Sequence, residues 1–222
     1  MKEGPMILHS LAPSVPVQVS YSWFAMAVLI GLAVAARMGL KKTAPTGVQN
    51  LMEVVVGGLE DFIEDIMGPE GKNYFTVIAS LFLFILVCNL MGLVPGFDSP
   101  TANINTTLAL ALVSFSATHY IGLRRHGIGY VKHFMGPMWL LAPLMLPIEL
   151  ISHLARPMSL AVRLMGNMMA DHKVVMSFFA LVPILVPLPF LLLGLLVCLV
   201  QALVFCTLTM VYIGSAIEHE EH

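Results

Sequence analysis

Long apolar runs, separated by short polar or basic segments, dominate the hydrophobic pattern of this chain. An α-helix needs about 20 such residues to cross the roughly 30 Å hydrocarbon core of a bilayer. The runs are continuous rather than alternating, and this argues against a closed barrel, the other structure able to span lipid. The pattern therefore predicts an all-α integral membrane protein with about five membrane helices.

The segment 46–67 has a different pattern, because its apolar residues recur at helical spacing and acidic residues occupy the other side. This predicts an amphipathic helix at the membrane surface. A helix held by anionic lipid would have a basic polar face, so we expect this one to pack on a protein partner or on the chain's own spans. Simple contact with water also explains its charges. The expected buried positions are Val48, Leu51, Val55, Leu59, Phe62 and Ile66.

We expect a single membrane domain over residues 1–222. Basic residues follow the first and third spans, and the positive-inside rule places both ends in the cytoplasm. The N-terminus should then lie outside and the C-terminus in the cytoplasm. A segment with Gly and Pro breaks at 127–147 is expected to re-enter from the cytoplasmic side. The expected elements are an outer tail (1–18), spans at 19–37, 73–94 and 105–124, the surface helix at 46–67, and two long final helices at 139–181 and 189–217.

Composition supports the membrane assignment, since 58% of the residues are hydrophobic and only 11% are charged. A soluble domain carries about 25% charged residues. With a net charge of -2 and no basic face, the chain is not expected to bind nucleic acid. The three cysteines lie in apolar runs without a CxxC pair, which predicts buried inert thiols rather than a disulfide or a metal site. We expect no cofactor.

The segment 147–175 is long enough to span a bilayer, yet it carries several charged residues. A charge at the bilayer centre costs between about 2.5 and 17 kcal/mol, and the guanidinium of Arg163 cannot escape this cost by losing its proton. At helical spacing, Arg163 shares one side with small residues, which let another helix approach closely. This predicts a contact surface with a fixed cation, for which a carboxylate on the partner is the natural counterpart. The alternative is an arginine that extends to the headgroups. The side in question comprises Ser159, Arg163, Gly166, Asn167 and Ala170.

Further polar residues lie on other helices. Gln201 is the main strongly polar residue in the body of the last helix. Counted from the shared turn, it lies within about a turn of the depth of Arg163. Several polar residues lie on the middle spans and their outer connection. Each could be a helix cap or an interhelical hydrogen bond, and together they would suit a water-filled vestibule on the outer side. They are Asn89, Asp98, Asn103, Asn105 and His119.

Four motifs make the sequence resemble subunit a of F-type ATP synthases, and the resemblance covers nearly the whole chain. They are SLAVRLMGNMMADH at 159–172, LVQALVFCTLTMVYIGSAIE at 199–218, NLMGLVPG at 89–96 and SPTANINTTLALAL at 99–112. The resemblance implies a non-catalytic subunit in the inner membrane of a bacterium, with its last two helices strongly tilted against a ring of c subunits. The b-subunit peripheral stalk and the rest of the ATP synthase would be further partners.

The resemblance also implies roles for individual residues. Arg163 would be the essential stator arginine that deprotonates rotor carboxylates, with Asn167 beside it and Gln201 facing it. Two aqueous half-channels would carry the protons. The chain departs from one common bacterial pattern, which has glycine and then glutamate at the positions of Asp171 and His172. The usual partner of that glutamate would fall near Gly194, so either residue could relay the proton. The half-channel candidates are Glu149, Ser159, Asp171, His172, Asp98, Asn103 and His119.

An ion-coupled secondary transporter or channel is the main alternative function. Such proteins usually contain internal repeats with paired broken helices, and the segment around Arg163 has no second copy in the sequence. A purely structural membrane subunit is a third possibility, and a deep charged residue argues against it. No GxxxxGK[ST] loop is present, so sites for phosphoryl transfer to or from ATP must lie on other chains.

Overall fold

The computed structural model describes residues 16–38, 47–94, 97–127, 142–181 and 187–217, and all regular structure within them is helical. Four of the described helices are long and apolar enough to cross a membrane. The expected all-α membrane fold is therefore confirmed. The elements are α1 (Val17–Met38), α2 (Val48–Met67), η1 (Pro69–Tyr74), α3 (Phe75–Met91), η2 (Pro100–Ala102), α4 (Ile104–His126), α6 (Ala142–Leu181) and α7 (Pro187–Ile217).

The described part of α6 begins at Ala142 and contains Pro147, a residue shared by the expected re-entry segment (127–147) and the expected helix (139–181). α7 begins at Pro187, where the expected helix began at 189. Proline removes one backbone donor but keeps a helical φ angle, and membrane helices tolerate it where neighbouring groups compensate. The rest of the re-entry segment, 128–141, and most of the outer tail lie outside the described residues.

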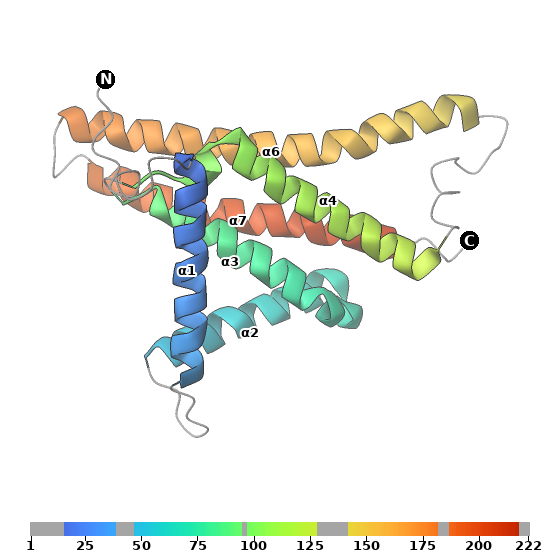
Figure 1. The fold of residues 1–222 in the computed structure, drawn as a ribbon, viewed down its shortest axis with the longest axis horizontal. Helices are drawn as coiled ribbons and strands as arrows, with labels where there is room; N and C mark the ends of the chain where they lie inside the picture. The colour runs from blue at the N-terminus through green and yellow to red at the C-terminus, as the bar shows by residue number, and fades with distance from the viewer. Residues whose placement is uncertain (1–15, 39–46, 95–96, 128–141, 182–186, 218–222) are drawn as a thin grey trace.

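α6 and α7 pack against each other, and both run across the direction of α1 (Figure 1). The 22 residues of α1 give a length of about 33 Å at 1.5 Å per residue, close to the hydrocarbon thickness of about 30 Å. The 40 residues of α6 give about 60 Å, so this helix cannot lie upright within the hydrocarbon. The crossing direction in Figure 1 is that of the strongly tilted pair that the family resemblance implied.

One apolar core holds α6 against α3, α4 and α7. Leu160 and Leu164 of α6 are 1% and 0% exposed, and Phe205 and Met210 of α7 are fully buried in the same cluster. Since residues four apart lie on one face of a helix, the two leucines fix the rotation of α6 about its axis. Arg163 falls beside that buried face rather than on it.

α2 packs on the chain's own spans through its second half. Leu59 and Ile63 belong to the main core, which confirms that this helix uses an apolar face for contact within the chain. Leu51 and Ile66 were expected on the same face, but they are exposed. Leu51 lies about 12 Å from Leu59 along α2, at 1.5 Å per residue. It is therefore too far along the helix to reach the core that Leu59 joins.

A buried polar group joins α3 to α7 and to η2. Asn89 is 1% exposed; its Nδ2 donates to the carbonyl oxygen of Cys198 at 3.3 Å, and its Oδ1 accepts from Thr101 Oγ1 at 2.6 Å. Interhelical hydrogen bonds in membrane proteins are worth about 0.6 kcal/mol on average and up to about 1.7 kcal/mol. We expect Asn89→Ala to lower the free energy of unfolding by about 1 kcal/mol.

Unfolding in mixed detergent micelles at increasing SDS fraction measures this loss. Ser80→Ala is the matched control on the same helix, because the Ser80 hydroxyl is exposed and only donates to Val77 within its own helix. Equal midpoints for the two variants would contradict the expectation.

Candidate functional site

Polar groups occupy three levels along α6. Glu149 and His153 lie near its start, Arg163 lies in the middle, and Asp171 and His172 lie towards its end. At 1.5 Å per residue, Arg163 is about 15 Å along the axis from His153 and about 14 Å from His172. One helix thus carries an isolated cation between two separate polar regions.

Arg163 is exposed, and it makes no hydrogen bond or ion pair with any other residue that the structure describes. Ser159 and Ala170 on the same side of α6 are also exposed. The guanidinium therefore has no counter-charge from the described part of its own chain. A partner carboxylate that approached this side would find a permanent cation bordered by small side chains.

Asn167 lies one turn after Arg163 and links α6 to α7. Its Nδ2 donates to Gln201 Oε1 at 2.7 Å, which confirms to within a turn the depth expected for Gln201. The side chain of Gln201 is 4% exposed, and its Nε2 finds no acceptor among the described residues. A buried donor without a partner costs about 1–3 kcal/mol, so this amide is poised to bond a group that is not part of the described chain.

The polar region at the end of α6 joins it to the segment after α3. His172 Nδ1 donates to the carbonyl oxygen of Gly92 at 3.2 Å, and His172 Nε2 lies 3.9 Å from Asp98 Oδ1. The side chains of His172 and Asp98 are 27% and 40% exposed. Other residues of the described chain therefore leave both side chains partly uncovered.

The carboxylate of Asp171 occupies space that a side chain at position 194 would otherwise fill. A Cβ added to Gly194 on α7 would lie 2.7 Å from Asp171 Oδ2 and 2.7 Å from Leu93 Cδ2. Real Cβ atoms essentially never come this close to other atoms. Gly194 therefore lets α6 and α7 approach closely enough to bring the acid beside α7.

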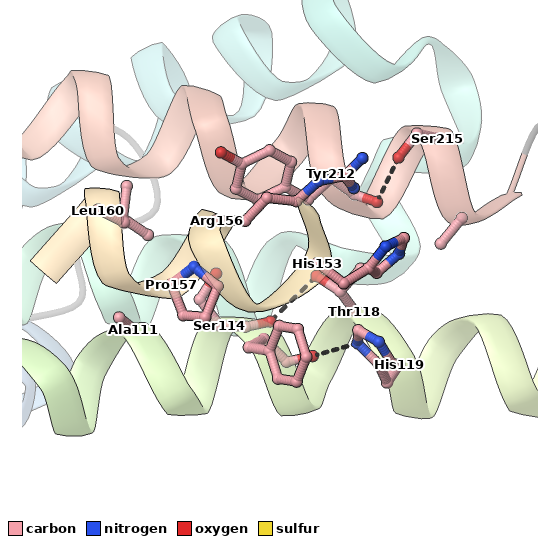
Figure 2. Close-up of a pocket in the computed structure, with 12 residues that line it drawn as sticks. Ala111, Ser114, Thr118, His119, His153, Arg156, Pro157, Leu160, Tyr212 and Ser215 are labelled. Atoms are coloured by element: carbon pink, nitrogen blue, oxygen red, sulfur yellow. Dashed lines mark hydrogen bonds between the residues drawn. The ribbon is translucent and has the colours of Figure 1, made fainter. Parts of the chain in front are cut away.

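The polar region at the start of α6 is a pocket between α4, α6 and α7 (Figure 2). His153 Nδ1 lies 3.2 Å from Glu149 Oε1, and the His153 and His119 rings meet edge to face with centroids 5.6 Å apart. The cavity has a volume of about 70 Å³, enough for several water molecules. The polar residues that line it are Ser114, Thr118, His119, His153, Arg156, Tyr212 and Ser215.

Arg156 lies over the ring of Tyr212, with its Cζ 5.2 Å from the ring centroid (Figure 2). This cation–π contact fixes the guanidinium at the pocket wall. His153, Arg156 and Tyr212 were not among the functional residues predicted from the sequence. The spacing of Glu149 and His153 by four residues was a detectable signal, but their contact with α4 and α7 required the packing of the helices.

Of the remaining candidate residues, some make hydrogen bonds only to residues close in sequence, and the others lie in the polar regions at the start and end of α6. Asn103 caps α4 by accepting from the Asn105 N–H at 2.9 Å, and Ser159 Oγ donates to the Arg156 carbonyl at 2.9 Å. His119 was grouped with Asp98 in an outer vestibule, but the structure does not bring them together. His119 lies more than about 20 Å along α4 from Asn103, at the pocket of Figure 2.

Within the described residues, no group of three or more His, Cys, Asp or Glu side chains could hold a metal ion. The three cysteines are buried, as their apolar runs predicted. They are Cys88, Cys198 and Cys206.

The family model and the similar proteins that match this chain all describe the same kind of subunit. Residues 19–214 match the family model described as ATP synthase A chain. The chain is 52% identical to the ATP synthase subunit a of Geobacter sulfurreducens over 200 residues, which cover 90% of this chain and 87% of that protein. It is 54% identical to the ATP synthase subunit a of Trichlorobacter lovleyi over 90% of this chain and 86% of that protein. For the ATP synthase subunit a 3 of Pelobacter propionicus, the identity is 52% over 90% of this chain and 87% of that protein.

Proposed function

Because this chain belongs to the ATP synthase A chain family, we propose that the exposed side of α6 around Arg163 is its stator surface for a rotor that carries carboxylates. The chain is a non-catalytic, proton-translocating membrane subunit of an ATP synthase, and it acts within that complex together with other subunits. The membrane is bacterial, as the relatives and the apolar helices indicate.

The observation that carries this proposal is the exposed guanidinium of Arg163, which is unpaired within the described residues. A rotor carboxylate must be neutral while it faces lipid, because an isolated ionised carboxylate is very costly there. Beside Arg163 the ionised form is stabilised, so the acid gives up its proton. The rotor then advances, and the acid takes a proton from the other side of the membrane.

The two polar regions supply the two half-channels of this cycle. The basic residues after α1 and at the end of α4 assign those ends to the cytoplasm. The pocket lined by His119 and His153 then opens towards the cytoplasm, and the region with Asp98, Asp171 and His172 opens outside. Arg163 lies between the two regions, and its fixed charge repels protons that would pass directly from one to the other.

Asp171 is the stronger candidate for the outer relay. In the pattern that the sequence resembles, a titratable residue on the last helix would fall near Gly194. Here the carboxylate of Asp171 lies directly against Gly194, so the acid comes from α6 instead. His172 connects the end of α6 to the segment after α3, through its contacts with Asp98 and the Gly92 carbonyl.

The partners of this cycle are a ring of c subunits, which carries the acids, and a peripheral stalk of b subunits, which holds the chain against rotation. Each proton that crosses gains about 2.3 kcal/mol per 100 mV of membrane potential, so several must be coupled to the synthesis of one ATP.

Oxidative cross-linking tests the stator surface. We expect Ser159→Cys and Ala170→Cys to form disulfides with a cysteine placed one turn from the rotor carboxylate, because both residues are exposed beside Arg163. Replacing Cys88, Cys198 and Cys206 with alanine removes background thiols. The matched control is Ile30→Cys, which is 64% exposed on α1 and should not cross-link. Equal yields at all three positions would contradict the proposal.

A further inference from the structure

His119 and His153 face each other in the pocket between α4, α6 and α7, about 15 Å along α6 from the arginine. Their ring centroids are 5.6 Å apart, with the rings edge to face. His153 is 6% exposed, and the cavity beside the pair has room for several waters. The half-channel described above includes this pocket, but it gives neither histidine a step of its own.

The charged and titratable groups around the pair come from all three helices. Glu149 lies 3.2 Å from His153 Nδ1, and Arg156 lines the same pocket. Tyr212 of α7 holds Arg156 through its ring. An acidic and a basic side chain thus lie beside the two rings.

Hydrogen bonds hold both rings through the same nitrogen. His119 Nδ1 donates to the Phe115 carbonyl at 3.0 Å, and His153 Nδ1 faces the Glu149 carbonyl and carboxylate at 3.1 and 3.2 Å. Each Nδ1 is thus engaged within its own helix, and these contacts hold the two imidazoles beside the cavity.

We propose that the His119–His153 pair is the proton-exchange station of the cytoplasmic half-channel. This inference rests on the proposed function. During pumping, one imidazole of the pair takes a proton from cytoplasmic water, and the pair passes one proton towards the rotor carboxylate. During synthesis the same proton moves in reverse. One proton enters and one leaves, so the pair returns to its starting charge.

Inverted membrane vesicles containing the whole complex test this station, because their cytoplasmic face is outside and the bath pH acts directly on the pocket. ATP-driven proton uptake is measured between pH 6 and 8, and the rate of the His119→Gln/His153→Gln variant is divided by the rate of the parent at each pH. We expect a ratio of about 0.1 near neutral pH that falls as the pH rises, since water alone must then supply a scarcer proton.

His126→Gln is the matched control, because this histidine also lies on α4 but does not line the pocket; its ratio should stay near one at every pH. A constant ratio for the double variant would indicate only a packing defect, and it would overturn the proposal, as would a ratio near one. If the double variant does not assemble, the two single variants are measured, and a flat ratio in both is the overturning result. Normal uptake by Arg163→Ala would instead contradict the proposed function itself.

Discussion

Replacing Arg163 with alanine is expected to abolish ATP-driven proton pumping while leaving the complex assembled. The guanidinium is the only charge that the described residues place between the two polar regions on the exposed side of α6. Removing one partner of a desolvated charge pair costs about 3–5 kcal/mol. Such a cost corresponds to a loss of at least about a hundredfold in rate. Because Arg163 makes no contact that α6 needs within the described chain, the helix should keep its place.

Inverted vesicles with a fluorescent pH probe measure this loss, and the amount of subunit retained with the purified complex measures assembly. Arg124→Ala is the matched control, since this arginine is exposed at the end of α4 and should leave pumping unchanged. Normal pumping by Arg163→Ala would refute the stator role.

The second large effect is expected from Asp171→Leu combined with His172→Leu. The change removes both titratable groups of α6 from the outer region, together with the His172 contacts to Gly92 and Asp98. General acid–base groups contribute about 10²–10⁴ to proton-transfer rates, and Asp98 remains. We therefore expect proton transport to slow by about a hundredfold and its dependence on outer pH to change, because two groups that can bind a proton are removed.

Proteoliposomes with a defined internal pH isolate the outer side when the catalytic sector faces the bath. Asn105→Ala is the matched control on the outer connection, because only its backbone N–H bonds to Asn103. An unchanged dependence on internal pH in the double variant would mean that the outer half-channel runs through other residues.

Much of the fold was predictable from sequence, because in lipid every backbone N–H and C=O group must form a hydrogen bond within the protein. Apolar runs gave the helices, and the cost of a deep charge identified Arg163 without knowledge of its neighbours. The depth of Gln201 was also accessible, since it required only counting residues from a shared turn. These inferences depend on position along a helix, which the sequence contains.

Relations between helices that are distant in sequence could not be predicted in the same way. His119 was grouped with Asp98 because both lie on or near the middle spans, yet its partner is His153 of α6. The depth of His119 on α4 could be counted, but its facing helix could not. The fit of Asp171 against Gly194 has the same origin, because it follows from how closely two helices approach.

The continuity of α6 makes its length between the polar regions a fixed dimension. One more residue inserted between Arg163 and Asp171 would shift everything beyond it by about 1.5 Å and turn it by about 100° about the axis. The acid would then point away from Gly194 while the cation kept its place. Side chains along this helix can be substituted one at a time. Adding or removing a residue between Arg163 and Asp171 would instead change the angle between these two side chains about the helix axis.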